Sequence, residues 1–407
     1  MTLWKNVTVL AVLIAIVVTG NYLSDEASAA DSSNIYTDEE GGAEYTISGG
    51  IKPSARVTGW DGIHPDVIIK DSIVVNGRTY SVKSISADAF REKDITSLVL
   101  PNSDNSIDIY NNAFSGCTKL TTVSLGTSVV ELWDNIFKDC TALKTFTSTN
   151  LSSIGLNTFA GCSSLCEINL NNGLKTIGES AFRNCTALIK INLPDSVINI
   201  GSFAFSGCTS LTEVDLSGKL QSVSTSLFEN CSSLKSIHIP GSVNSFGSRS
   251  FKDCTSLASI TFGDGVDNIY GYELFLNCSF ETVLLPASVS KLNLESHTGR
   301  QTMWPTTLST ISVAESNPFF SSEDGILFTK DKSLLLLCPS GKTGSVTVNV
   351  NVDAYAFYNS SLEHLVLSDG VTSIGDYAFA NSALIDVIWT KTPDTVTSTA
   401  TRFWIHS

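Results

Sequence analysis

The residues best able to do chemistry in this chain are its ten cysteines, and their spacing decides which chemistry is open to them. Eight of them stand three residues after a phenylalanine. These cysteines are Cys117, Cys140, Cys162, Cys185, Cys208, Cys231, Cys254 and Cys278, and they follow Phe114, Phe137, Phe159, Phe182, Phe205, Phe228, Phe251 and Phe275. Successive phenylalanines are 22 to 24 residues apart. A repeat of this period indicates a solenoid of stacked coils.

A cysteine that recurs once per coil should form a column along the solenoid axis. Strands of adjacent coils lie about 4.8 Å apart with parallel side chains, whereas the Cβ atoms of a disulfide prefer ~3.8 Å. We therefore predict that the column is reduced and fills the core. We also expect Cys208→Ser to destabilise at least as much as Cys208→Ala, because serine would bury a hydroxyl. Cys166 and Cys338 lie outside the column and are the only candidates for reactive or paired thiols; we predict that both are free.

The sequence contains no motif for metal binding, nucleophilic catalysis or nucleotide binding. The five histidines are His64, His238, His297, His364 and His406, and neither H-E-x-x-H nor C-x-x-C occurs. No G-x-S-x-G motif occurs. Ser340 to Thr343 resembles the end of a phosphate-binding loop, but Leu336 stands where that loop needs its first glycine. We therefore predict no catalytic residue, no metal and no cofactor, and a chain that is not an enzyme.

The coil from Leu188 to Cys208 shows how the repeat is built. It reads Leu188-x-x-Ile191-x-Leu193-Pro194-x-x-Val197-x-x-Ile200-Gly201-x-x-Ala204-Phe205-x-x-Cys208. Alternation around Ile191 predicts a short strand with one buried face. Each coil then contributes one strand to a parallel sheet, and its inward residues are buried only by stacking on neighbouring coils.

This repeat resembles the BspA-like class of leucine-rich repeats, a family of surface proteins from bacteria and some protists. Ala43 to Phe90 is similar to the usual lead-in of that family, and Asn317 to Pro339 is similar to the hairpin island that interrupts its repeats. The resemblance implies an α/β repeat, mostly β, with one parallel strand per ~23-residue coil. It also implies an adhesin or surface antigen. Val197 stands where the commonest leucine-rich repeat has Asn, so the binding geometry of that class is not transferred.

The resemblance and the repeat together give the domain organisation. We expect a signal peptide at 1–29, an N-terminal β lead-in or cap at 30–80, the solenoid at 81–310, the β-hairpin island at 311–345, and terminal repeats with a C-terminal tail at 346–407. The repeats near the C-terminus lack the cysteine, since Ser360 and Ser382 stand in its place.

The first residues have the pattern of an export signal. Lys5 precedes an apolar stretch from Val7 to Val18, and Ala27 to Ala29 gives a small-x-small cleavage site. The stretch is short against the roughly 20 residues that span a bilayer. The pattern favours cleavage over retention, and a secreted or cell-surface protein without stable membrane insertion after cleavage.

The net charge of the chain limits the classes of partner that it can be expected to bind. The formal net charge is −15, with 25 Lys and Arg against 40 Asp and Glu. Nucleic acids and anionic membranes recruit basic patches, so neither is expected as a partner. We expect a binding or adhesion protein that recognises a protein or glycan macromolecule, such as one from a host or its matrix. The alternative is a structural or self-associating surface protein without a high-affinity ligand.

Two surfaces could bind such a partner. The first is the outward face of the sheet, where polar residues flank each inward residue. Its central positions are Glu167, Asn169, Lys190, Asn192, Glu213, Asp215 and His238. The second is an aromatic edge at the position that follows the second inward residue of each coil. That position is often glycine but holds Tyr110, Trp133 and Tyr270 in three coils. Both surfaces could equally be ordinary solvated or covering residues.

Three of the Asn-x-Ser/Thr sequences, those that begin at Asn184, Asn230 and Asn277, overlap the cysteine column. They arise because polar residues flank the cysteine column, and they matter for glycosylation only in a eukaryotic protein.

Overall fold

The computed structural model describes residues 35–294, 303–390 and 397–398. Apart from Ile35, these residues belong to one compact unit, Tyr36–Ser407. The expected signal peptide at 1–29 lies outside the described residues, as do His297, His406 and most of the C-terminal tail. The described part of the chain is built from β-strands, turns and loops.

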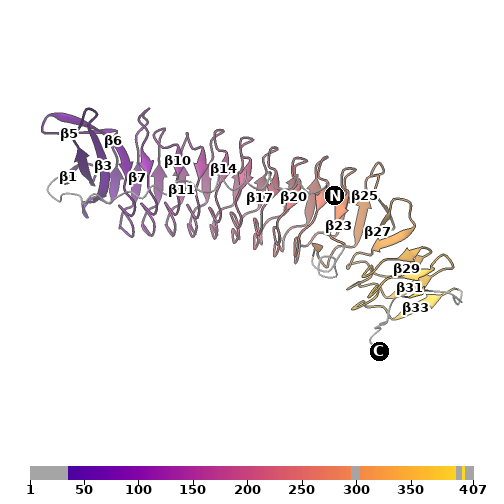
Figure 1. Cartoon of the computed structure of the whole chain (residues 1–407). Coiled ribbons are helices and arrows are strands. Elements are labelled where there is room, and N and C mark those ends of the chain that lie inside the picture. Colours follow the sequence, from indigo (N-terminus) through magenta and orange to yellow (C-terminus); the bar gives the residue numbers. More distant parts are fainter. Residues whose placement is uncertain (1–34, 295–302, 391–396, 399–407) are drawn as a thin grey trace, which may run out of the picture. The chain divides into compact units, whose positions relative to one another are not determined.

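The chain begins with a sheet that covers the first coils (Figure 1). Its strands are β1 (Ile35–Thr37), β2 (Ala43–Ser48), β3 (Ser54–Trp60), β5 (Ser72–Val75), β6 (Arg78–Ile85) and β8 (Asp108–Ile109). The order is β1-β2-β3-β6-β5, and β8 also pairs with β6. Asn76 and Gly77 join β5 to β6 with φ of 52° and 77°, as a tight hairpin turn requires. Because β8 belongs to a coil, the sheet continues directly into the solenoid.

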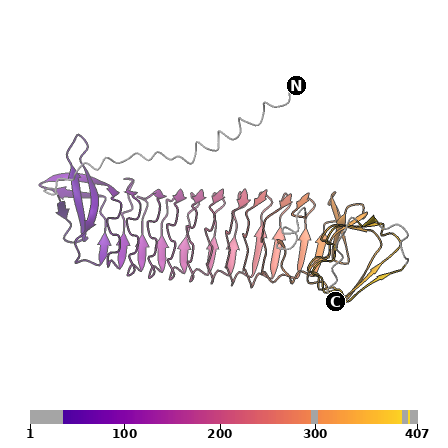
Figure 2. The same ribbon diagram turned by 60° about the horizontal axis from the view of Figure 1, so that its bottom comes forward.

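The coils contribute two columns of strands, which Figure 2 shows side by side. The longer strands are β4 (Asp66–Ile68), β7 (Ser97–Val99), β9 (Thr122–Ser124), β11 (Thr145–Thr147), β13 (Glu167–Asn169), β15 (Lys190–Asn192), β17 (Glu213–Asp215), β19 (Ser236–Ile239), β21 (Ser259–Phe262), β23 (Thr282–Leu285) and β25 (Thr310–Val313). The shorter strands after β8 are β10 (Glu131–Leu132), β12 (Ser153–Ile154), β14 (Thr176–Ile177), β16 (Asn199–Ile200), β18 (Ser222–Val223), β20 (Ser245–Phe246), β22 (Asn268–Ile269) and β24 (Lys291–Leu292). The predicted mostly-β solenoid is therefore confirmed, with a second, shorter strand in each coil.

Register between coils places like residues above one another. Phe146 pairs with Val123 and Ile168 in parallel register, and all three side chains are buried. The phenylalanine column begins one coil earlier than the cysteine column, at Phe90, and Trp304 continues it beyond Phe275. From Phe90 to Phe275 the rings stack with centroids 4.9 to 5.6 Å apart. Offset stacking at this spacing adds to the burial of each ring.

The longer strands do not form one uninterrupted ladder, which differs from the single parallel sheet that we predicted. The ladder β4-β7-β9-β11-β13 ends at β13, and β15-β17, β19-β21 and β23-β25 form separate pairs. The strands still follow one another from coil to coil (Figure 1).

Each coil also turns through two residues with left-handed backbone. In the coil of Phe205 these are Phe203 and Gly207, with φ of 60° and 77°. The second of these positions is filled mostly by Gly, Asn or Asp, the residues that tolerate this conformation. Asn184, Asn230 and Asn277 occupy it with φ of 60°, 63° and 62°. The asparagines of the three glycosylation-like sequences are therefore explained by the backbone.

The hairpin island lies between two hydrophobic cores. Its strands β26 (Phe320–Glu323) and β27 (Ile326–Thr329) are antiparallel, as are β27 and β28 (Leu334–Leu337). Leu327 and Leu336 pack into the core of the preceding coils, whereas Ile326 and Leu335 pack into the core of the following ones. Burial on both faces explains the unbroken apolar sequence of β28.

The C-terminal coils repeat the arrangement on a smaller scale. Their longer strands are β29 (Ser345–Val348), β31 (His364–Leu367) and β33 (Asp386–Trp389), and their shorter ones are β30 (Asn351–Val352), β32 (Ser373–Ile374) and β34 (Thr397–Ser398). The order β28-β30-β32-β34 joins the shorter strands to the island. Phe357 and Phe379 continue the aromatic pattern with ring centroids 5.5 Å apart.

Candidate functional site

All seven side chains predicted for the sheet face point to solvent. Glu167, Asn169, Lys190, Asn192, Glu213, Asp215 and His238 are each exposed. The reason is the alternation of each strand, because the residue between each pair is buried: Ile168 in β13, Ile191 in β15 and Val214 in β17. The structure therefore brings the predicted polar positions onto one face over four successive coils.

Charges on this face meet between β15 and β17. Lys190 lies opposite Glu213, and Lys190 Nζ donates to Glu213 Oε1 at 2.7 Å. This hydrogen bond, together with the charges of Glu213 and Asp215, raises the pKa of Lys190 above its ordinary value. In the neighbouring pair of strands, His238 Nδ1 lies 2.9 Å from Thr261 Oγ1. The seven residues of this face include one lysine, Lys190, and three carboxylates, those of Glu167, Glu213 and Asp215. The face as a whole is therefore acidic.

The aromatic edge is only partly a single surface. Tyr110 and Trp133 pack edge to face with ring centroids 6.0 Å apart, and the Arg56 guanidinium lies 5.9 Å from the centroid of Tyr110. Trp133 and Tyr270 are 46% and 49% exposed. Tyr270, however, lies several coils further along the chain and does not join the other two.

The glycines at this edge have a packing role. A Cβ on Gly201 would lie 2.4 Å from the backbone nitrogen of Glu179 in the preceding coil. The same closeness holds at Gly178 and Gly247, whose added Cβ atoms would meet backbone at 2.6 and 2.1 Å. The position of Gly271 over the carbonyl of Gly247 shows that Gly271, rather than Tyr270, continues this column. Tyr270 is therefore an inserted residue, which the count from Ile269 did not reveal.

The cysteine column is reduced, as predicted. All ten cysteines are free thiols in the structure, and the eight of the column are buried. Each thiol has a hydrogen-bond acceptor that sequence reasoning missed. Cys208 Sγ donates to the Phe182 carbonyl of the preceding coil at 3.2 Å, and the same bond recurs from Cys117 to Cys278. The column is thus a ladder of weak S–H donors as well as core filling.

The remaining two thiols differ in burial. Cys338 is fully buried, with Sγ 3.8 Å from Ser360 Oγ, and burial raises the pKa of Cys338 to about 12. Cys166 is exposed beside Glu167, and Sγ lies 3.6 Å from the Lys144 carbonyl. Cys166 is thus the accessible thiol of the described chain, while Cys338 is chemically inert.

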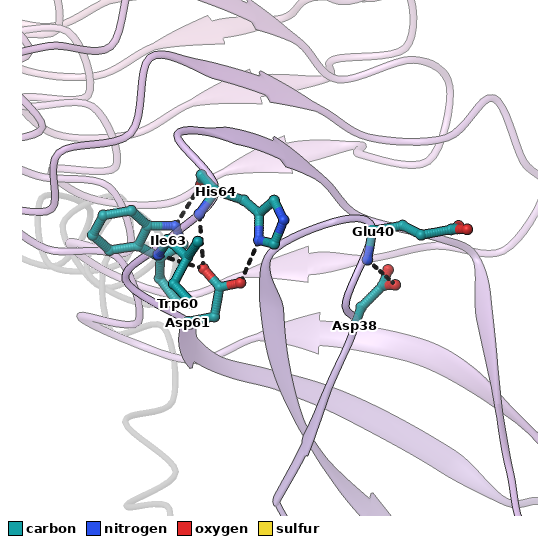
Figure 3. Close-up of polar contacts among 6 residues, drawn as sticks. All are labelled: Asp38, Glu40, Trp60, Asp61, Ile63 and His64. Carbon is teal, nitrogen blue, oxygen red and sulfur yellow. Dashed lines mark hydrogen bonds and ion pairs between the residues drawn. The ribbon is translucent and has the colours of Figure 1, made fainter.

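A polar turn after β3, shown in Figure 3, was not predicted. Asp61 Oδ1 accepts the backbone N–H groups of Ile63 and His64, and Asp61 Oδ2 lies 2.5 Å from His64 Nδ1. Trp60 Nε1 donates to the His64 carbonyl at 2.6 Å. Burial alone would raise the pKa of Asp61, but these hydrogen bonds hold it below its ordinary value. The Asp61-Gly62 pair is a turn signal that could have indicated this loop.

Neither a metal site nor a membrane-spanning helix occurs in the part of the chain that the structure describes. Residues 35–294 and 303–390 hold no group of three or more His, Cys, Asp or Glu arranged to bind a metal ion. Within the same described residues, no helix has the length and apolar character needed to cross a membrane.

Comparison with known proteins identifies the repeat. The model of the BspA type leucine-rich repeat region matches residues 83–197, 175–303 and 349–402, which together cover more than half of the chain. No curated protein gave a significant match.

Comparison with solved structures returns other leucine-rich repeat proteins. A leucine-rich repeat protein from Bacteroides ovatus has 18% sequence identity and a TM-score of 0.53, with 86% of this chain and 98% of that one covered. A leucine rich cell surface protein from Faecalibacterium prausnitzii has 22% identity and a TM-score of 0.40, with 88% and 77% covered. A leucine rich repeat protein from T. pallidum has 25% identity and a TM-score of 0.38, with 55% and 91% covered. Since the family model matches coil after coil of the solenoid, this chain belongs to the BspA-type leucine-rich-repeat family.

Proposed function

We propose that this protein is a non-enzymatic binding or adhesion protein, secreted or held at the cell surface, that recognises a protein or glycan macromolecule through the outward face of β13 to β19. The observation that carries the proposal is the row of exposed polar side chains from Glu167 to His238 over four successive coils. A rigid face with polar groups at regular intervals suits an extended partner, whereas small molecules favour concave sites.

Electrostatics favours a partner with positive groups along its length. The excess of carboxylates at Glu167, Glu213 and Asp215 lies on a chain whose net charge is −15. Fields of one sign speed the encounter with an oppositely charged partner and weaken as salt rises. Binding through this face should therefore slow as ionic strength increases.

The test replaces Glu167, Lys190, Glu213 and Asp215 together with serine. Exposed ion pairs such as Lys190–Glu213 contribute little to stability, so the variant should fold. Its binding to purified extracellular-matrix glycoproteins, measured by surface plasmon resonance, is expected to fall at least tenfold relative to the native protein. The matched control replaces Asp94 and Lys119, an exposed ion pair between coils that lies off the face, and should bind normally.

Other outcomes reject this face. Unchanged binding by the fourfold variant, with loss on changing Tyr110 and Trp133 to alanine, would move the site to the aromatic edge. Binding to none of the glycoproteins, with concentration-dependent self-association in analytical ultracentrifugation, would support a self-associating surface protein instead.

A further inference from the structure

A polar groove opens on the loops that join the two strand columns near the start of the solenoid. Its volume is about 370 Å³, which falls within the range of roughly 300–1,000 Å³ common for small-molecule sites. Three successive coils line it. The residues are Ser103, Asp104 and Ser106 from the first, Thr127, Ser128 and Val130 from the second, and Thr149 and Asn150 from the third.

The groove exists because these three loops differ in length. Between the last inward residue of the longer strand and the end of the shorter one, the chain runs from Leu100 to Ile109, from Leu125 to Leu132 and from Ser148 to Ile154. The first loop is thus two residues longer than the second, and the third is one residue shorter. The groove is lined by the long first loop, the middle loop and the short third loop together.

Close packing fixes the long first loop, from Leu100 to Ile109, in place. Gly126 has a φ of 56°, and a Cβ there would lie 2.4 Å from the Pro101 carbonyl oxygen. Asn105 Nδ2 donates to the carbonyls of Asp71 and Val82, which ties the loop to the N-terminal sheet. The groove is therefore built by the backbone before any ligand arrives.

The hydrogen bonds of the lining side chains decide what the groove can accept. Thr127 Oγ1 donates to the Ser103 carbonyl, and Thr149 Oγ1 donates to the Gly126 carbonyl. Ser128 Oγ donates to the Leu125 carbonyl, and Asn150 Nδ2 donates to the Thr127 carbonyl. The exposed hydroxyls of Thr127 and Thr149 each donate their one proton to the backbone and keep lone pairs for a ligand, whereas the Ser128 hydroxyl is buried. The Asp104 carboxylate is exposed and adds further acceptors.

We propose that this groove binds a neutral pyranose unit, either free or as part of a glycan chain. Sugar hydroxyls can donate to Thr127, Thr149 and Asp104 and can accept from the hydroxyl groups of Ser103 and Ser106, and two neighbouring hydroxyls match the two oxygens of the Asp104 carboxylate. Val130, an exposed apolar side chain among these polar groups, offers a contact for the C–H groups of the ring. The site is separate from the sheet face, so its ligand need not be the partner of that face.

The test is saturation-transfer difference NMR with the methyl glycosides of glucose, galactose and mannose. At least one glycoside should bind saturably, with a dissociation constant on the order of millimolar for so small a ligand. Asp104→Ala should weaken binding about tenfold, because it removes hydrogen bonds to a charged acceptor. Ser106→Phe should abolish binding by filling the groove. The control Asp108→Ala removes an exposed carboxylate of the same coil that does not line the groove, and should bind like the native protein.

Several results would overturn the proposal. These are the absence of saturable transfer to all three glycosides, or equal binding by the native protein and both groove variants. Glucosamine, measured in the same way, is the cationic comparison: binding of glucosamine without binding of any of the three glycosides would also overturn the proposal, since the groove would then select a cation. Urea unfolding of each variant shows whether a loss of binding reflects a loss of folding.

Discussion

At the scale of single residues, each column cysteine is held by a carbonyl of the preceding coil. Phe182 O accepts both the backbone N–H of Cys185 and the thiol of Cys208. The expectation that serine would be at least as harmful as alanine at Cys208 took no account of this acceptor. Ser360 and Ser382 take the equivalent place after Phe357 and Phe379, and Ser382 Oγ donates at 2.6 Å to the carbonyl of Phe379, three residues before it in its own coil.

We therefore expect Cys208→Ser to cost less than Cys208→Ala. The alanine variant leaves a small cavity and should lower the free energy of unfolding by about 1–3 kcal/mol. The serine hydroxyl can donate to Phe182 O in place of the thiol, so its burial is compensated. Urea unfolding under reducing conditions measures both. A serine variant less stable than the alanine variant would show that this carbonyl does not accept from the serine hydroxyl.

Thiol accessibility is the second prediction at this scale. In the folded protein, Ellman's reagent at pH 8 should titrate Cys166 rapidly and leave the buried thiols unmodified, because the reagent cannot reach them. After unfolding in denaturant without reductant, the other cysteines should react as well. A Cys166→Ser variant is the control and should show no fast phase, whereas a persistent fast phase would mean that a column thiol is exposed.

At the scale of the elements, the thiol ladder makes stability depend on alkaline pH. Burial raises the pKa of the column thiols from Cys140 to Cys278, that of Cys208 to about 12, against ~8.5 for an unfolded cysteine. A raised folded pKa means that this contribution is complete below pH ~8.5 and is lost as pH rises through the folded value. Between these limits each thiol should cost about 1.4 kcal/mol per pH unit.

The measurement compares the native protein with Cys208→Ala between pH 8 and pH 11. The difference in their free energies of unfolding should shrink by about 1.4 kcal/mol per pH unit above pH ~9, because the variant lacks one ionising thiol. Comparing the two proteins cancels the titration of other groups. A difference that is independent of pH would contradict the burial of this thiol.

The glycine column gives another prediction for the coil as an element. Gly201→Ala should destabilise by more than 2 kcal/mol, roughly the scale of a severe core substitution, since its Cβ would strike the backbone of Glu179. Gly218→Ala is the matched control, because no atom lies within 4 Å of its added Cβ. Thermal unfolding by circular dichroism compares them. Equal melting temperatures for the two variants would mean that the coils can separate at Gly201 without cost.

Much of the coil could be read from the sequence, because the repeat averages out local ambiguity. The period of Phe205 and its equivalents predicted the stacking, and alternation around Ile191 predicted the buried and exposed faces of each strand. The left-handed residues, the insertion at Tyr270 and the groove at Asp104 could not be read in the same way. They depend on how one coil differs from its neighbour and on backbone contacts that no single residue type reports.

At the scale of the whole molecule, the island divides the described chain into two cores. Ile326 and Leu335 belong to one core, and Leu327 and Leu336 to the other. In repeat proteins each unit is stabilised chiefly by its neighbours, so damage spreads only as far as the coupling between units allows. The two cores should therefore respond unequally to a local defect.

We predict that Phe357→Ala, which should cost about 3–5 kcal/mol, acts mainly on the C-terminal core. Hydrogen exchange should accelerate in β29, β31 and β33, while β9 to β17 keep native protection. Phe205→Ala is the control and should give the reverse pattern. Uniform acceleration in both variants would show that the island couples the two cores into one cooperative unit.

The dependence of each coil on its immediate neighbours also bears on how such a chain changes over generations. The thiol of Cys208 reaches only to Phe182, and the backbone contact of Gly201 reaches only to the coil before it. A duplicated or deleted segment of one full period would meet the same contacts at its new borders. Gene duplication can thus lengthen or shorten the array in whole coils, while the unequal loops that form the groove record where smaller insertions and deletions have been tolerated.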